Sequence, residues 1–237
     1  MPAGHAREGE TATRSEGTRT VEVQQAVLGR NARLAERNRG YLHALGIRAV
    51  NVMSSPGAGK TSLLEHTIRE LGKRAPVAVV VGDLATARDA ERLNAAGGRV
   101  VQITTGSVCH LDAEMVARGI AELDLTGCGL LLLENVGNLV CPADFDLGES
   151  GRAVLLSVTE GEDKPLKYPP MFRAADVVVL SKIDLAEVCG IDLPQLRENV
   201  RAVVRPGTPV LEVSVRTGLG LRDWLYWLGG GVEKAKG

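Results

Sequence analysis

The segment Ser54-Ser55-Pro56-Gly57-Ala58-Gly59-Lys60-Thr61 stands between an apolar run and an amphipathic stretch that begins at Lys60. It matches the phosphate-binding loop pattern G-x-x-x-x-G-K-[S/T], with serine in the first glycine position. Small residues let successive backbone N–H groups turn toward an anion, and the following helix adds the dipole of its N-terminus. A strand before the loop and a helix after it are the required context, so the sequence predicts a nucleotide-binding P-loop.

The residues expected to bind the nucleotide in this loop are consecutive: Pro56, Gly57, Ala58, Gly59, Lys60, Thr61 and Ser62. The Lys60 side chain can reach the β- and γ-phosphates, which makes it a candidate catalytic residue as well. The Thr61 hydroxyl can ligate Mg²⁺, so we expect Mg²⁺ as a cofactor.

Short apolar runs alternate with amphipathic stretches along most of the chain. The apolar runs cover residues 47–53, 77–81, 99–103, 130–133, 153–158, 177–180 and 209–213. Helical patterns cover residues 60–71, 87–96, 112–123, 193–204 and 219–228. This alternation is typical of parallel sheets covered by helices. We therefore predict an α/β fold: a single P-loop NTPase domain with a mainly parallel seven-stranded sheet, helices on both faces and a preceding N-terminal helix.

The composition and the N-terminal segment suggest the surroundings of this domain. Residues 1–18 have no apolar periodicity and are expected to form a disordered tail, residues 19–46 a helix packed on the domain, and residues 47–230 the domain itself. The 237 residues carry 28 Lys and Arg against 29 Asp and Glu, a net charge of −1. This balance argues against binding to nucleic acid or membranes. The absence of a signal peptide or an apolar span favours a cytoplasmic protein.

Two carboxylates follow predicted strands. Asp83 ends the second apolar run, and Glu134 comes directly after the run 130–133. Ligands of such sheets bind at the carboxyl ends of the strands, and an isolated carboxylate buried there is costly unless it has a function. We expect Asp83 and Glu134 to hold Mg²⁺ or the attacking water, and count both with Lys60 as candidate catalytic residues. Asp89 and Glu91 are expected to lie on a solvated helix face.

The segment Ser181-Lys182-Ile183-Asp184 follows a predicted strand and resembles the Asn-Lys-x-Asp motif that selects guanine. The Asp184 carboxylate can accept from guanine N1–H and the 2-amino group, whereas adenine offers it no such donors. Lys182 can lay its aliphatic stem over the base. Ser214 and Val215, after the last strand, are placed to back the base. The predicted ligands are therefore GTP and GDP.

Three potential soft-metal ligands lie in two loops that follow strands. These are Cys109, His110 and, 32 residues beyond the first, Cys141. Thiolates and imidazole suit Ni²⁺ or Zn²⁺ better than Mg²⁺. From their spacing alone, these three residues could equally be ordinary core residues. Cys128 is interpreted as a core residue. The nearness of both loops to the nucleotide motifs favours a metal site.

Taken together, these residues resemble the HypB family, the GTPases that help to insert nickel into [NiFe]-hydrogenase. The similarity covers roughly residues 20–228 and is most specific in five segments: residues 50–57, 82–86, 109–113, 134–142 and 158–169. No role for the last segment follows from its residues alone. The urease accessory family UreG is an alternative, but its contiguous Cys-Pro-His motif differs from the separate Cys-His and Cys-Pro of this chain.

The resemblance implies a GTPase of the signal-recognition/MinD class that converts GTP and water to GDP and phosphate and forms a homodimer on binding GTP. It implies an interfacial nickel or zinc site made by Cys109, His110 and Cys141. It also implies exchange of nickel with the zinc-containing partner HypA and indirect delivery to the hydrogenase large subunit. The N-terminal segment has only His5 in place of a Cys-rich or His-rich nickel site, so no tight N-terminal site is expected. Ser181 in place of Asn is a second departure from the family.

Two further alternatives come from other functional classes. In a GTP-regulated dimerisation module without metal transfer, the thiols would be core residues. An ATP-dependent small-molecule kinase is disfavoured by Asp184.

Overall fold

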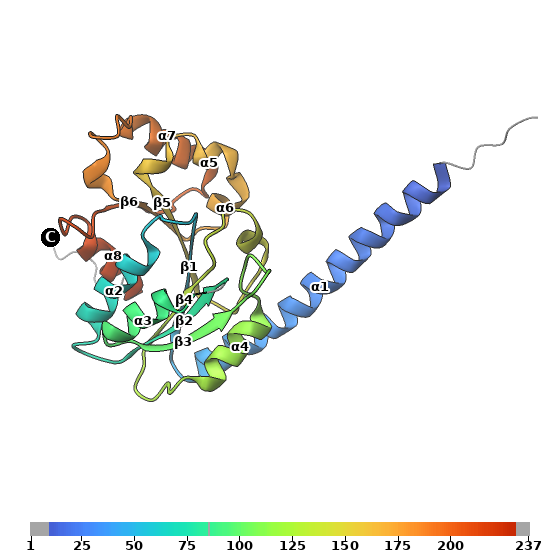
Figure 1. The fold of residues 1–237 in the computed structure, drawn as a ribbon, viewed down its shortest axis with the longest axis horizontal. Helices are drawn as coiled ribbons and strands as arrows, with labels where there is room; N and C mark the ends of the chain where they lie inside the picture. Colours follow the sequence, from blue (N-terminus) through green and yellow to red (C-terminus); the bar gives the residue numbers. More distant parts are fainter. Residues whose placement is uncertain (1–9, 85, 231–237) are drawn as a thin grey trace, which may run out of the picture.

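A computed structural model describes residues 10–84 and 86–230; for residues 10–24 it describes the backbone only. Its strands are β1 (Arg48–Ser54), β2 (Val77–Asp83), β3 (Arg99–Thr104), β4 (Leu130–Glu134), β5 (Gly151–Ser157), β6 (Val177–Ser181) and β7 (Val210–Val213). Its α-helices are α1 (Glu10–Ala44), α2 (Lys60–Leu71), α3 (Arg88–Ala95), α4 (Ala113–Glu122), α5 (Lys164–Lys167), α6 (Pro169–Arg173), α7 (Leu193–Val203) and α8 (Leu221–Leu228). Figure 1 shows their arrangement.

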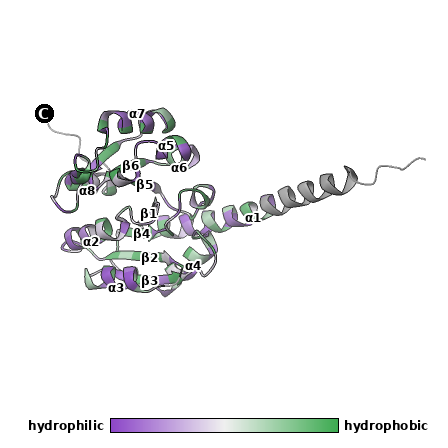
Figure 2. Cartoon of the chain, turned by 45° about the horizontal axis from the view of Figure 1, so that its top comes forward, coloured by the Kyte–Doolittle hydropathy of each residue, from purple (hydrophilic) through white to green (hydrophobic). Residues whose placement is uncertain are grey.

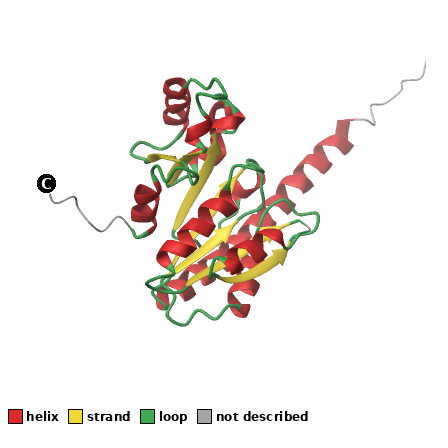
Figure 3. Ribbon diagram, turned by 60° about the vertical axis from the view of Figure 1, so that its left-hand side comes forward, coloured by secondary structure: helices red, strands yellow, loops and turns green. Residues whose placement is uncertain are grey.

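The seven strands form one parallel sheet in the order β3-β2-β4-β1-β5-β6-β7. The central strands are buried on both faces, which explains why their sequences are continuous apolar runs. The predicted fold, a seven-stranded P-loop domain with helices, is therefore confirmed. Figure 3 shows the yellow sheet with red helices on each side.

Helices on both faces complete three clusters of buried side chains. One cluster joins the sheet to α2, α3 and α8, through residues such as Leu64, Leu93 and Trp224. The opposite face packs against α1 and α4 near β1–β4, and against α6 and α7 near β5 and β6. In Figure 2, β2 is coloured as hydrophobic, whereas α2 and α7 carry both colours, as expected for helices with one buried side.

The N-terminal helix differs from the expected boundaries. It begins at Glu10 rather than at residue 19, so residues 10–18 are helical and not part of a disordered tail. Extending an existing helix adds one hydrogen bond per residue, while starting one is costly, so the helix of the following residues can continue into this stretch. The helix ends at Ala44, two residues before the predicted end at Gly46, whose φ of 67° suits glycine in the turn that follows. Residues 1–9, including His5, lie outside the described residues.

The parallel topology places the loops after β1, β2, β3 and β4 at one edge of the sheet, the edge where ligands bind in this type of fold. Among the described residues, no helix combines the length and the apolar character required to cross a bilayer. The helices α5 and α6 fall in the segment 158–173, where no element was predicted because it shows no apolar period.

Candidate nucleotide and metal site

The P-loop surrounds a cavity at the carboxyl edge of the sheet. Gly57 and Gly59 have φ values of 76° and 95°, conformations that side-chain-bearing residues rarely adopt, and α2 begins immediately after them at Lys60. The cavity has a volume of about 390 Å³. It is lined by Pro56, Gly57, Gly59, Lys60, Thr61, Gly82, Asp83, Leu84, Asp89, Arg92, Glu134, Asn135, Val136 and Gly137.

The serine in the first glycine position contacts the P-loop lysine. The Lys60 ammonium donates to Ser54 Oγ over 2.9 Å, and both residues are buried. Burial lowers the pKa of Lys60, while Glu134 acts in the opposite direction. The departure from the usual glycine thus gives Lys60 a hydroxyl partner at the base of the loop.

Thr61 and Glu134 meet where Mg²⁺ was expected. The Thr61 hydroxyl donates to Glu134 Oε1 over 2.8 Å, and Glu134 is 3% exposed. Glu134 Oε2 is also buried and accepts no hydrogen bond from the residues that the structure describes. A hydroxyl beside an unpartnered carboxylate oxygen is a fitting donor set for a hard cation such as Mg²⁺. Burial raises the pKa of Glu134 to about 7, although Lys60 and Thr61 oppose the shift.

This raised pKa predicts a pH dependence of stability for the nucleotide-free, metal-free protein. Between pH 4.5, the ordinary pKa, and about 7, folded Glu134 binds more protons than unfolded Glu134. The free energy of unfolding should therefore fall as pH rises through this window, by up to roughly 3 kcal/mol. We expect Glu134→Gln to remove this fall, as measured by urea unfolding at pH 5 and pH 8 with a chelator. The exposed Glu198→Gln should behave as the unaltered chain, and an unchanged pH dependence in Glu134→Gln would contradict the assignment.

Asp83 also lines the cavity, at the end of β2, and its Oδ1 accepts from the Thr86 backbone N–H over 3.0 Å. Asp89 differs from expectation, because it lines the cavity instead of lying on a purely solvated face, whereas Glu91 is exposed. Arg92, one turn further along α3, lines the cavity as well and is held by Glu65 at 2.7 Å.

A second cavity, of about 370 Å³, lies between the start of α2 and the loops that follow β6 and β7. It is lined by Ser62, Leu63, Ser181, Lys182, Asp184, Leu185, Val213, Val215 and Arg216. Ser181 donates to the carbonyl of Ala58 over 2.7 Å, and Lys182 donates to the carbonyl of Gly57 over 2.7 Å. Both residues of the guanine-type motif therefore brace the P-loop. Ser181 stands where the motif usually has Asn, and its hydroxyl still hydrogen-bonds to the P-loop backbone.

Asp184 is oriented by two neighbours. Ser214, which is buried, and Arg216 hydrogen-bond to its carboxylate, and together they lower its pKa. Arg216 Nε lies 2.7 Å from Asp184 Oδ2, but its own side chain is 71% exposed and such pairs are weak. A charged, pre-oriented carboxylate in a cavity with apolar walls suits the recognition of a base with two adjacent N–H donors.

The two loops with soft-metal ligands meet in space. Cys109 Sγ lies 2.9 Å from Cys141 Sγ and 4.0 Å from His110 Nδ1, and the three ligand atoms all lie within 4.8 Å of one another. All three side chains are partly exposed. Burial lowers the pKa of His110, which favours the neutral imidazole that binds metals. The contact with the Cys109 thiol raises the pKa of Cys141, so acid should oppose metal binding.

The segment 134–141 runs from the 390 Å³ cavity around the P-loop (the phosphate cavity) to this Cys-His-Cys group. Its Gly137 packs so closely on the P-loop that a Cβ would lie 3.0 Å from the Cα of Pro56. Its Asn138 side chain donates to the Cys109 carbonyl over 3.4 Å. The segment therefore contacts the P-loop through Gly137 and the Cys109 loop through Asn138.

Comparisons with known proteins agree with this geometry. Residues 48–212 match the family model for the CobW/HypB/UreG nucleotide-binding domain. The hydrogenase maturation factor HypB of Azotobacter vinelandii is 50% identical over 220 residues, covering 93% of this chain and 71% of the relative. The chain belongs to the HypB family.

Solved HypB structures have the same fold. HypB from Archaeoglobus fulgidus has a TM-score of 0.80 at 41% identity, covering 86% of this chain and all of that one. HypB from Helicobacter pylori, solved in complex with nickel, has a TM-score of 0.79 at 37% identity, covering 88% and 99% of the two chains. The predicted HypB resemblance is thus confirmed, and the chain carries the P-loop nucleotide-binding domain of this family.

Several residues around the HypB site were not predicted. Arg92 and Asn135 line the phosphate cavity, and Phe145 stacks on the His110 ring with centroids 3.9 Å apart. Glu160, from the segment without an assigned role, hydrogen-bonds to Ser55 of the P-loop. Arg92, Phe145 and Glu160 have no local sequence signal, because each contact joins segments that are distant along the chain. Asn135 directly follows Glu134 at the end of β4, and that position was a local signal.

Proposed function

We propose that this HypB chain is a GTP-hydrolysing metallochaperone that binds nickel, or zinc, at Cys109, His110 and Cys141. The observation that carries the proposal is the segment 134–141, which begins at a carboxylate in the phosphate cavity and ends at a metal ligand. Hydrolysis at one end of this segment alters ligand geometry at the other. Nickel is the cargo, and the open, three-ligand set suits transfer better than permanent storage.

In the proposed reaction, the P-loop backbone and Lys60 hold the β- and γ-phosphates, and Thr61 and Glu134 hold Mg²⁺. When bound, Mg²⁺ neutralises charge that develops on the phosphate oxygens. Asp83, on the neighbouring strand, orients the attacking water or assists the metal. Asp184, Lys182, Ser214 and Val215 select and back the guanine.

GTP binding is proposed to favour a homodimer that brings two Cys-His-Cys sets together. Leu84 and Val140, in the loops after β2 and β4, are 46% and 60% exposed, which is consistent with an interface at this edge. We also propose exchange of nickel with a HypA-type partner, indirect delivery to the [NiFe]-hydrogenase large subunit and a cytoplasmic location; membership of the HypB family supports these proposals.

A competition experiment tests the nucleotide part of this proposal. Fluorescent GDP bound to the protein with Mg²⁺ should be displaced by GTP but not by the same concentration of ATP. Phosphate should be released from GTP alone. The reason is that adenine leaves the Asp184 carboxylate without donors. Equal displacement by ATP would instead favour the kinase alternative, and GTP binding without any phosphate release would favour a regulatory module.

A further inference from the structure

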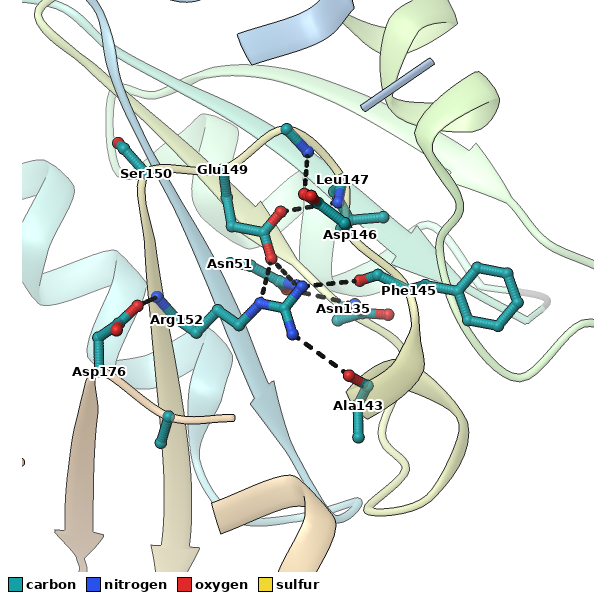
Figure 4. Close-up of polar contacts among 12 residues, drawn as sticks. Asn51, Asn135, Ala143, Phe145, Asp146, Leu147, Glu149, Ser150, Arg152 and Asp176 are labelled. Atoms are coloured by element: carbon teal, nitrogen blue, oxygen red, sulfur yellow. Dashed lines mark hydrogen bonds and ion pairs between the residues drawn. The ribbon is translucent and has the colours of Figure 1, made fainter. Parts of the chain in front are cut away.

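We propose that the buried pair Glu149–Arg152, together with Asn51 and Asn135, is a positioning network that fixes both metal-ligand loops relative to each other. The role deepens the proposed metal-binding function and rests on it. Figure 4 shows this network, of which only Asn135 lines one of the two nucleotide cavities.

Arg152, on β5, holds the loop that carries Cys141. Its Nε donates to Glu149 Oε1 over 2.6 Å. Its two terminal nitrogens donate to the carbonyls of Ala143 and Phe145 over 3.2 and 3.3 Å (Figure 4). Ala143 belongs to the 3₁₀ turn Cys141–Asp144, which begins at this ligand. The guanidinium therefore fixes the turn on which this ligand is mounted.

The same carboxylate reaches the other ligand loop through two amides. Glu149 Oε1 accepts from Asn51 Nδ2 over 3.3 Å, and Asn51 Oδ1 accepts from Asn135 Nδ2 over 3.2 Å. Asn135 Oδ1 then accepts from the backbone N–H of Leu111 over 3.0 Å. Leu111 directly follows His110. One unbroken chain of hydrogen bonds thus connects the turn of Cys141 to the segment Cys109-His110.

Phe145 adds a second connection between the loops. Its carbonyl is held by Arg152, and its ring stacks on the His110 imidazole at 3.9 Å with 30° between the planes. The orientation of the imidazole therefore depends on the backbone that Arg152 fixes. A single guanidinium acts on Cys141 through the turn and on His110 through the Phe145 ring.

The burial of this network argues for a role beyond stability. The Glu149 side chain is 2% exposed and that of Arg152 is 19% exposed. Desolvating such a pair is costly, and apolar replacements of similar volume are often no less stable. Groups that orient metal ligands, by contrast, typically change metal affinity 10- to 100-fold when altered.

The test compares the full chain with two network variants. Arg152→Lys keeps the charge beside Glu149 but lacks the fork that reaches both carbonyls. The double variant Glu149→Gln with Arg152→Gln removes both charges, so that neither is left buried and unpaired. We expect each to weaken Ni²⁺ binding about 10- to 100-fold by calorimetry. We also expect altered thiolate-to-metal absorption with Co²⁺, and an unchanged affinity for GDP.

A destabilised control separates positioning from loss of stability. Leu196→Ala, a change at a buried residue of α7 that is not part of the hydrogen-bond network, should lower the melting temperature without changing Ni²⁺ affinity or the Co²⁺ spectrum. Ni²⁺ affinity within twofold of the unaltered chain in both network variants would overturn the positioning role. An equal loss in Leu196→Ala would also overturn it. An unaltered chain that binds no Ni²⁺ would overturn the proposed function and this role together.

Discussion

Asp184→Asn should lose GTP affinity by on the order of 100-fold or more and gain affinity for xanthosine triphosphate. The carboxylate accepts two hydrogen bonds, from N1–H and from the 2-amino group of guanine. An amide turned to accept from N1–H presents its own donor to the 2-amino group, and the two donors repel. Xanthine has an oxygen at that position, which pairs with the amide. In the unaltered chain, Ser214 and Arg216 hydrogen-bond to the Asp184 carboxylate and orient it.

The measurement is displacement of fluorescent GDP by GTP, xanthosine triphosphate and ATP. Asp223→Asn, an exposed change of the same type on α8, should leave all three affinities unaltered. If Asp184→Asn bound GTP as tightly as the unaltered chain, the second cavity would not be the guanine site.

Cys141→Ala should reduce Ni²⁺ affinity by more than the 10- to 100-fold typical of groups that merely support ligands. It removes one of three donor atoms that lie within 4.8 Å of one another, and alanine offers no replacement. Cys109→Ala should cause a similar loss. Because binding displaces protons from the thiols, affinity of the unaltered chain should also fall as the pH is lowered from 8 to 6.

Calorimetric titration of Ni²⁺ at fixed pH measures this effect, with proton release followed in buffers of different ionisation enthalpy. Cys189→Ala is the matched control, since this free thiol is exposed and lies outside the cluster. Unchanged Ni²⁺ binding in both Cys109→Ala and Cys141→Ala would eliminate the ligand set.

The elements of this fold were predictable because their signals are local. Residues 60–71 were predicted as helical from a P-loop and an apolar period, and the structure has α2 at the same bounds. Apolar runs marked all seven strands, and the five inner strands are buried on both faces, which requires apolar residues on both. The predicted start of α1, at residue 19, differs from the observed start at Glu10, because polar composition alone does not distinguish a solvated helix from a disordered tail.

The site was predictable only in part. Asp83 and Glu134, which end strands, were predicted to lie at the site because a parallel sheet brings its strand ends to one edge, and both line the phosphate cavity. The same rule explains why the thiols of Cys109 and Cys141 meet although they are 32 residues apart. Arg152 lies at the start of β5, where no rule about strand ends applies, so its hydrogen bonds to the Cys141 turn needed the structure.

The most direct test of the coupling between nucleotide and metal is a Ni²⁺ titration of the Mg²⁺-loaded protein in two states, with GDP and with a non-hydrolysable GTP analogue, while its mass is recorded. We predict that the Ni²⁺ affinities of the two states differ at least fivefold, and that a dimer mass is found in the analogue state alone. Because coupling is reciprocal, Ni²⁺ should change the affinity for the analogue relative to GDP by the same factor. Equal Ni²⁺ affinities in both states would contradict the account.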